Sequence, residues 1–360
     1  MEFLQDTLWW SYRYLQHTFQ MMYWVWIPGF LVTGLLAARY QARALAALLE
    51  AKEGPGRAVK RAFVLGLLGS AQRQRAFRLA AVLLDRQVSP VAVGAFLVAS
   101  HSSVLYLLGF IMIEVGMEFA LGQLVAVLLT AALLQAGWGL AGLPATAGES
   151  HGATPRPPEA PQDLLTAGPG GTTWGQVLQT SAGWSSVLRY IRREFRGFGL
   201  PLLYGVVLGG VILAAGKAGW WPQLTQGTGL ADDLVSALIA PFVSMLALAP
   251  PAGNIFVATS FWKTFTWEYP GMVSLLLTGL LIPQNWGSLR NLFGRGAAVR
   301  LALLLAIAAV LSALVVTAAF DVVSLRPAHV PWFRELVDRL MMWFPFTMDP
   351  FGPTPPMKGM

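Results

Sequence analysis

Four consecutive polar residues interrupt an otherwise apolar part of the chain. They are Gln72, Arg73, Gln74 and Arg75. Two guanidinium groups at one interruption could hold an anionic group, because arginine binds carboxylates and oxyanions through paired N–H donors. The glutamines would add neutral hydrogen bonds. The other interpretation is structural: the arginines extend to a polar surface or pair with Glu114 or Glu118.

A second interruption carries prolines and an asparagine. It reads Pro250-Pro251-Ala252-Gly253-Asn254, and a shift of 180 residues, from 72 to 252, places the first polar stretch on it. We therefore take Pro251, Gly253 and Asn254 as candidate binding residues. The alternative for Asn254 is that it only caps the helix that follows, since asparagine is a favoured helix N-cap.

His101, Ser102 and Ser103 lie side by side inside the apolar run 90–113, and of these we take His101 and Ser102 as candidate site residues. A histidine in an apolar run could relay protons, because its ordinary pKa is close to neutral. It could equally form a hydrogen bond with a neighbouring helix. Glu114 and Glu118 would carry protons if they were buried, but the pattern of runs predicts that they lie in a solvated loop.

Several kinds of chemistry are not expected from this sequence. The chain has no cysteine, so disulfides and thiolate metal sites are excluded. Four scattered histidines give no metal-ligand spacing, and no phosphate-binding loop or hydrolase triad is present. We therefore expect no bound metal, no cofactor and no enzymatic activity.

The composition predicts an all-α integral membrane protein. Charged residues make up 12% of the chain, about half the ~25% of a soluble domain, so lipid must cover much of the surface. The net charge of +7 fits Lys and Arg in cytoplasmic loops rather than a nucleic-acid partner. The N-terminus has no cleavable signal pattern, so the first apolar run reads as a retained span.

Apolar runs of about 20 residues, the length that crosses a bilayer, occur at 21–38, 90–113, 117–140, 198–215, 270–288 and 297–320. The regions 62–88 and 234–265 each contain two shorter runs around a break, which predicts re-entrant hairpins. Residues 1–20 read as an interfacial amphipathic helix, 143–196 as a cytoplasmic linker, and 321–360 as an amphipathic tail.

The order of span, hairpin, span, span occurs twice, in residues 21–142 and 197–320. Three full spans per half would invert the second repeat relative to the first. Placing 39–61 inside then also puts 189–196 and 290–300 inside, in agreement with the positive-inside rule. We expect a multi-pass protein of the cytoplasmic membrane with both termini outside and a site where the breaks meet.

Residues 64–100 and, more weakly, 246–279 resemble the ArsP-type predicted permeases, whose best-known members export trivalent organoarsenicals. The Cys-Ser-Cys-Gly positions of that family fall on Gln72, Arg73, Gln74 and Arg75. The resemblance implies a permease fold. Because thiolates are the ligands that suit trivalent arsenic, their absence argues against carrying that substrate over.

These observations lead to the hypothesis of a secondary exporter of a small solute, anionic or related to metalloids, working by alternating access between two repeats. The alternative is a non-transport scaffold or partner subunit built on the permease fold. A membrane enzyme acting on lipid would need a paired acid and base, which the sequence does not show. Expected partners are membrane lipid and an unknown small molecule, not nucleic acid, and a homo-oligomer stays open.

Overall fold

The computed structural model describes residues 2–21, 26–50, 55–145, 173–220, 229–264 and 267–325. These residues form helices joined by short connections, with no strand among them, which confirms the all-α prediction. The described helices of the first half are α1 (Glu2–Met21), α2 (Ile27–Glu50), α3 (Pro55–Leu67), α4 (Arg73–Asp85), α5 (Pro90–Ser102), α6 (Leu105–Glu114) and α7 (Met117–Gly137).

The second half begins with the short helix α10 (Trp174–Gln179) and the long helix α11 (Ser181–Lys217). It continues with α12 (Leu230–Ala247), α13 (Pro251–Lys263), α14 (Tyr269–Leu277), the 3-10 helix η2 (Thr278–Leu281), α15 (Pro283–Phe293) and α16 (Arg295–Val322). Local sequence explains the start of α5. Ser89 accepts a hydrogen bond from the Ala92 amide and Pro90 opens α5, an arrangement that favours a helix start.

Five helical stretches are long and apolar enough to cross a membrane: Pro90–Met112, Met117–Gly137, Ser181–Gly216, Leu230–Ala247 and Arg295–Val322. The chain is therefore an integral membrane protein of the multi-span helical class. Four of these stretches coincide with expected spans. The fifth, Leu230–Ala247, is longer than the hairpin arm that the sequence suggested.

Two expected spans differ in the structure. The run 270–288 is divided into α14, η2 and the start of α15. The run 21–38 includes residues 22–25, which lie outside the described residues, and α2 is not among the five apolar stretches.

The expected linker 143–196 also ends differently. Residues 146–172 lie outside the described residues, but 181–196 form the first turns of α11. With 37 residues, α11 is about 55 Å long, well beyond the ~30 Å hydrocarbon layer. Part of this helix must therefore extend past the membrane. Of the expected tail 321–360, residues 326–360 lie outside the described residues.

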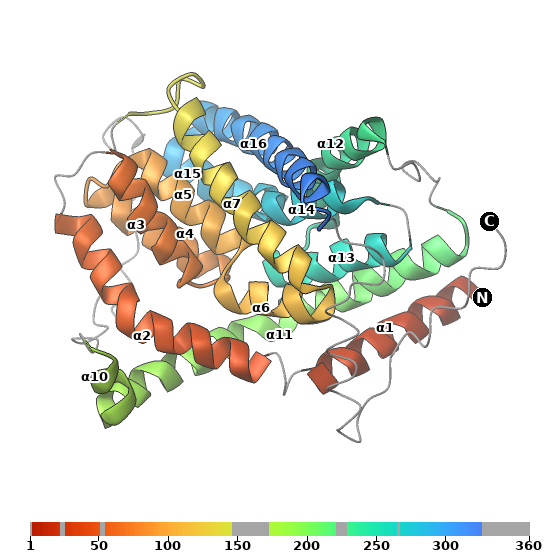
Figure 1. Cartoon of the computed structure of the whole chain (residues 1–360), viewed down its shortest axis with the longest axis horizontal. Coiled ribbons are helices and arrows are strands. Elements are labelled where there is room, and N and C mark those ends of the chain that lie inside the picture. The colour runs from red at the N-terminus through yellow and green to blue at the C-terminus, as the bar shows by residue number, and fades with distance from the viewer. Residues whose placement is uncertain are drawn as a thin grey trace.

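Helices α7 and α16 lie side by side on one face of the molecule, whereas α11 runs along the opposite side next to α1 (Figure 1). Exposed apolar side chains repeat along α7 at Leu121, Val125 and Leu128, and along α16 at Leu303, Ile307 and Leu311. This spacing places them on one face of each helix. A surface of this kind is suited to lipid, while the buried polar groups lie behind it.

Aromatic side chains fill the space between α2, α6 and α11. Phe30 packs against Tyr106 in a tilted arrangement with ring centroids 4.6 Å apart, and Trp26 contacts Phe198 edge-on with centroids 4.0 Å apart. Because these rings are large and buried, they fix the position of α6 against α11. The candidate site is built on this rigid support.

Candidate functional site

The first break comprises residues 68–72, between the end of α3 and the start of α4. Gln72 has extended backbone dihedrals at the N-cap of α4, and its backbone N–H donates to Ser70 Oγ at 3.1 Å. Arg73, Gln74 and Arg75 form the first turn of α4 instead of the break itself. The polar stretch seen in the sequence therefore marks a helix start.

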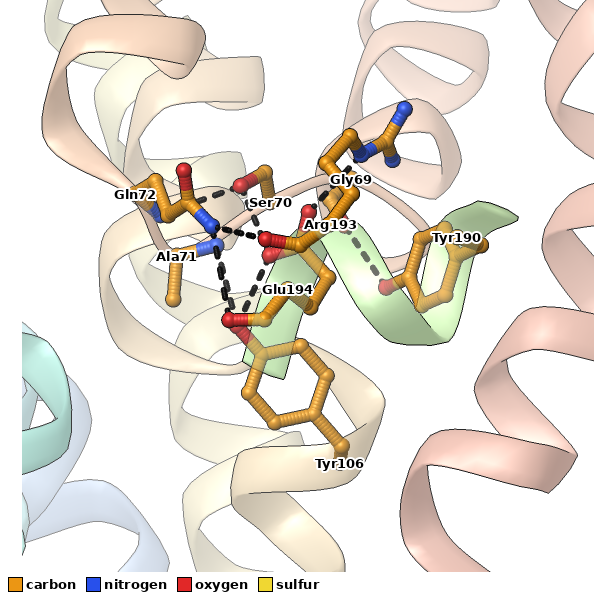
Figure 2. A network of polar contacts seen from close by, with 8 residues as sticks. All are labelled: Gly69, Ser70, Ala71, Gln72, Tyr106, Tyr190, Arg193 and Glu194. Atoms are coloured by element: carbon orange, nitrogen blue, oxygen red, sulfur yellow. Dashed lines mark hydrogen bonds and ion pairs between the residues drawn. The ribbon is translucent and has the colours of Figure 1, made fainter. Parts of the chain in front are cut away.

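A buried carboxylate on α11 binds the first break. Ser70 Oγ donates to Glu194 Oε2 at 2.7 Å, and the Tyr106 hydroxyl donates to the same oxygen at 3.2 Å. Arg193 Nε donates to Glu194 Oε1 at 3.1 Å. Figure 2 shows these donors gathered around Glu194, which is 1% exposed. A buried carboxylate needs such donors, since burying an unpaired charge is very costly.

The rest of the first break is also tied to α11 (Figure 2). Tyr190 donates its hydroxyl to the Gly69 carbonyl at 2.8 Å, and Gln72 Nε2 donates to the Arg193 carbonyl at 2.7 Å. Gly197 leaves space for Gln72, because a Cβ there would overlap the Gln72 side chain. The Tyr106 hydroxyl additionally accepts the Ala71 amide at 3.3 Å. Side chains of α11 and α6 therefore satisfy polar groups that the interrupted helix leaves open.

The arginines that the sequence singled out lie around this break. Arg73 Nη1 donates to the Gln284 carbonyl at 2.9 Å, so it bridges α4 and α15. Arg75 is half-buried, and its charge acts favourably on Glu194. Gln74 is exposed.

The expectation that Glu118 is solvated was wrong. Glu118 lies in the first turn of α7 and is 8% exposed, where the helix N-terminus favours a negative charge. The side chain of Glu114 lies outside the described residues.

The second break comprises residues 248–250, between α12 and α13. Leu248 adopts a left-handed conformation with φ 53°, which ends α12. The Tyr204 hydroxyl donates to the Ala247 carbonyl at 2.8 Å, and Gln284 Nε2 donates to the Leu248 carbonyl at 2.9 Å. The residue Gln284 therefore contacts both α4 and the second break.

Pro251, Gly253 and Asn254 occupy the first turn and a half of α13. Pro251 starts the helix after the N-cap residue Pro250. Gly253 packs against Gly205 of α11, and a Cβ on Gly253 would lie 2.8 Å from the Pro201 carbonyl oxygen. The interpretation of Asn254 as a cap was wrong, because its side chain instead lies 3.4 Å from Ser244 Oγ and is 1% exposed.

His101 and Ser102 lie where α5 gives way to α6. Ser102 Oγ donates to the Leu277 carbonyl at 3.0 Å, at the point where α14 changes into η2. A Cβ on Gly279 would lie 3.1 Å from the His101 carbonyl oxygen and 3.4 Å from Asn254 Nδ2. Gly279 therefore lies between a residue of α5 and a residue of α13. The end of α5, the change from α14 to η2 and the first turns of α13 after the second break therefore meet at this place.

We call this meeting point the central cluster and define it by its buried polar residues and the glycine between them. They are His101, Ser102, Gln123, Asn254, Gly279 and Asn285. Gln123 Nε2 donates to the Ser102 carbonyl at 3.3 Å, and Asn285 Nδ2 donates to the Leu280 carbonyl at 3.0 Å. The cluster joins α5, α7, α13, η2 and α15 deep inside the described part of the protein.

Four buried acceptor atoms of the central cluster have no hydrogen-bond partner within the described residues. They are His101 Nε2, Gln123 Oε1, Asn254 Oδ1 and Asn285 Oδ1. His101 Nδ1 lies 2.9 Å from the Leu97 carbonyl and must donate its proton to it. In a neutral histidine the other ring nitrogen, Nε2, is then an acceptor. Buried polar atoms are nearly always satisfied in proteins. The cluster is therefore suited to a ligand that donates hydrogen bonds.

Sequence reasoning found some of these residues and missed others. It named Gln72, Arg73, Gln74, Arg75, His101, Ser102, Pro251, Gly253 and Asn254, and the structure brings His101, Ser102 and Asn254 together. It missed Glu194, Ser70, Tyr106 and Tyr190 at the first break, and Gln123 and Asn285 in the centre. One signal was present: Glu194 is the single acidic residue in α11, four positions after Tyr190 and among arginines. Residues four apart share a helix face, so Tyr190 and Glu194 could have been expected to face the same neighbour.

Comparison with known proteins identifies a family for the chain. Residues 14–318 match the family model described as a predicted permease of the ArsP type. The match extends from within α1 to near the end of α16, so it includes both breaks and the central cluster. No curated protein and no solved structure matches the chain. Since the family model covers most of the sequence, the resemblance found in residues 64–100 is confirmed, and the chain belongs to the ArsP-type family of predicted permeases.

Proposed function

We propose that this protein is a secondary permease that moves a small solute across the cytoplasmic membrane by alternating access. Membership of a permease family points to transport rather than to catalysis. Transporters of this general kind place their sites near the bilayer midplane, where interrupted helices leave polar groups free for a ligand. The central cluster has this composition.

The observation that carries the proposal is the contact between two interrupted helices. Ser102 at the end of α5 donates to the Leu277 carbonyl at the end of α14, with Gly279 packed between His101 and Asn254. Irregular backbone inside a membrane is tolerated where it is buried in protein or lines a cavity. Polar atoms concentrated at such a junction fit a substrate path that is closed in this conformation.

The order of the helices supports two repeats. Helix α3 ends at Leu67 and α12 ends at Ala247, 180 residues later, and α5 begins at Pro90 while α14 begins at Tyr269, 179 residues later. In the first half the pair α3–α4, with a short break, is followed by the interrupted helix α5–α6 and then by the long helix α7. In the second half the pair α12–α13 is followed by the interrupted helix α14–η2–α15 and then by the long helix α16. We propose that the two repeats are inverted and that each helix pair is a re-entrant hairpin, in which α12, although long enough to cross, ends at the second break. Movement of one repeat against the other would then expose the central cluster to alternate sides.

Two features of the site suggest what the solute offers. The free acceptors of the central cluster favour a solute with O–H or N–H donors. Arg73 and Arg75 add positive charge at the start of α4. We propose a small, polyhydroxylated or oxyacid solute, with export as its direction. A soft metalloid would lack thiolate ligands here, because the chain has no cysteine.

A scaffold derived from the same fold is the alternative, and the tight hydrogen bonding at both breaks is the observation that favours it. Substrate flux separates the two. The protein is reconstituted into liposomes and tested with oxyanions, organic anions, methylated metalloids and neutral polyols. Asn254→Leu and the double variant Arg73→Ala/Arg75→Ala are compared with Arg78→Ala, an exposed arginine of the same helix α4.

We expect flux of at least one solute, its loss in Asn254→Leu, and reduced flux of anionic solutes in the double arginine variant. Arg78→Ala should behave as the wild type. Uptake into everted membrane vesicles, compared with right-side-out vesicles, tests the export direction. Folded protein with no flux across the panel, and with the variants indistinguishable from the wild type, would favour the scaffold.

A further inference from the structure

Glu194 is unusual among the charged residues of α11. The neighbouring Arg189, Arg192 and Arg196 are exposed, while Glu194 is 1% exposed and faces the first break. Its helix neighbour Tyr190 shares that face and is 4% exposed. A single carboxylate buried among basic residues is not needed to hold α11 in the membrane. Its position calls for a separate explanation.

The donors around Glu194 suit a carboxyl group that changes its protonation state. The groups that face it are Ser70 from the first break, Tyr106 from α6, Arg75 from α4, and Tyr190 and Arg193 from α11. The two hydroxyl donors can bond to a carboxylate or to the carbonyl oxygen of a carboxylic acid. The contact with Arg193 depends on the negative charge. Protonation therefore leaves the Ser70 and Tyr106 donors in place but removes the charge attraction between Glu194 and Arg193.

The bond between Glu194 and Ser70 is also a mechanical link. Ser70 Oγ accepts a hydrogen bond from the Gln72 backbone N–H at 3.1 Å and donates one to Glu194 Oε2 at 2.7 Å. The start of α4 is therefore connected to α11 through one hydroxyl group. Further links come from Gln72 to the Arg193 carbonyl and from Tyr190 to the Gly69 carbonyl. Weakening the link at Glu194 would loosen α4 where it meets α11.

The charged groups next to Glu194 are themselves partly exposed: Arg193, which bonds to it, and Arg75, whose charge acts on it. Gln74, in the first turn of α4, is exposed, and Arg73 and Arg75 are partly exposed. The exposed arginines of α11 lie in the same part of that helix as Glu194. The carboxyl group is thus buried only a short way behind a polar surface. Proton exchange from one side of the membrane needs no long relay.

We propose that Glu194 is the proton-binding residue that couples the movement of this permease to a proton gradient. The inference rests on the proposed transport function. One proton binds the carboxylate, the charge-assisted bond from Ser70 becomes a neutral one, and the first break separates from α11. Release of that proton to the other side regenerates the carboxylate and closes the break again, so one proton crosses in each cycle.

Hydrogen exchange tests the switch without any transport substrate. Full-length wild type, Glu194→Gln and Glu194→Asp are placed in nanodiscs, and exchange into peptides covering residues 69–76 is followed by mass spectrometry from pH 5 to pH 8. Peptides from residues 305–316 of α16 report the intrinsic effect of pH on exchange. Glu118→Gln is the matched control, because Glu118 is also a buried carboxylate but lies on α7.

We expect protection of residues 69–76 in the wild type to fall by about tenfold toward low pH, relative to residues 305–316, as a charged hydrogen bond is replaced by a neutral one. Glu194→Gln mimics the protonated acid and should show low protection at every pH. Glu194→Asp and Glu118→Gln should keep the pH dependence. The same pH dependence in Glu194→Gln as in the wild type, or none in the wild type, would overturn the proposal.

The two proposals can fail separately. In proteoliposomes with a measured solute, Glu194→Gln should abolish uphill transport driven by a pH gradient but leave downhill exchange of the solute intact. Uphill transport that survives in Glu194→Gln would contradict proton coupling at this residue while leaving the permease function standing. Absence of all flux in the wild type counts against the permease itself, whatever the exchange data show.

Discussion

Arg73 and Gln284 connect the two breaks of the protein. Arg73 Nη1 donates to the backbone carbonyl of Gln284 at 2.9 Å, and the Gln284 side chain donates to the Leu248 carbonyl at 2.9 Å. The start of α4 is therefore joined to the end of α12 through a single residue of α15. Because both ends of this connection belong to interrupted helices, we expect a movement at one break to act on the other.

Replacing Gln284 with alanine tests this connection. The substitution removes the side-chain bond to Leu248 but keeps the carbonyl that Arg73 uses, so the expected destabilisation is about 1 kcal/mol. We expect faster hydrogen exchange around residues 247–254 and little change around residues 73–78. Asn291→Ala, at an exposed position of the same helix, is the control. Equal effects of the two substitutions would show that the Gln284 side chain does not hold the second break.

Removing the Ser70 hydroxyl should destabilise the protein by about 1.5–3 kcal/mol, because the bond it makes is to a buried charge. The measurement is unfolding in mixed detergent micelles, with Ser70→Ala, Glu194→Gln and the double variant forming a cycle. We expect the double variant to lose less than the sum of the single variants, since both remove one interaction. Ser186→Ala serves for comparison, because that hydroxyl makes a solvent-exposed bond to the Ala182 carbonyl within the same helix, α11. Additive effects in the cycle would argue against the Ser70–Glu194 bond.

Packing of α11 against α13 depends on two glycines. A Cβ on Gly205 would overlap the backbone of Gly253, and membrane helices approach closely where small residues face each other. Gly205→Ala should therefore cost about 1–3 kcal/mol. Gly199, also on α11, has no atom within 4 Å of a Cβ position in the described structure, and Gly199→Ala should stabilise the helix by roughly 0.5–1 kcal/mol. Thermal unfolding of the two variants, in the same detergent, should give shifts of opposite sign.

A similar argument applies to Gly122 on α7. A Cβ there would overlap the hydroxyl of Tyr269, which is buried and has no hydrogen-bond partner within the described residues. Gly122→Ala should lower the unfolding free energy by about 1–3 kcal/mol. Tyr269→Phe removes the obstructing oxygen and should itself cost little. The double variant should recover part of the loss, and a double variant as unstable as Gly122→Ala would show that the overlap lies elsewhere.

The central cluster offers a prediction that separates transport from folding. Asn285→Leu removes the donor to the Leu280 carbonyl and a free acceptor, so we expect about 1–3 kcal/mol of destabilisation together with loss of flux. Ser312→Ala removes a bond of similar length, 3.0 Å from Thr130 to Ser312, between α7 and α16 away from the cluster. That variant should be less stable as well but should transport. Loss of flux in both would mean that flux follows stability and not the site.

Composition and periodicity determined much of the fold. The low charge content required lipid, and the apolar runs 90–113, 117–140 and 297–320 became spanning stretches nearly where the pattern placed them. These features are local: a run of apolar residues is driven into a bilayer whatever lies elsewhere in the chain. The polar stretch 72–75 likewise marked the start of a helix. The family resemblance depended on residues 64–100, which are contiguous in the sequence.

The interactions of the candidate site were decided by tertiary structure. The Ser70–Glu194 bond joins residues 124 positions apart, and the Ser102–Leu277 bond joins residues 175 positions apart. No periodicity connects such residues. The buried state of Glu118 and the division of the run 270–288 also depended on neighbouring helices. The sequence alone identified four of the segments that can cross a membrane, 90–113, 117–140, 198–215 and 297–320, because burial in lipid depends on each segment's own composition. Only the folded chain determined which polar groups meet there, because a buried donor or carboxylate takes its partner from whichever helix packs against it.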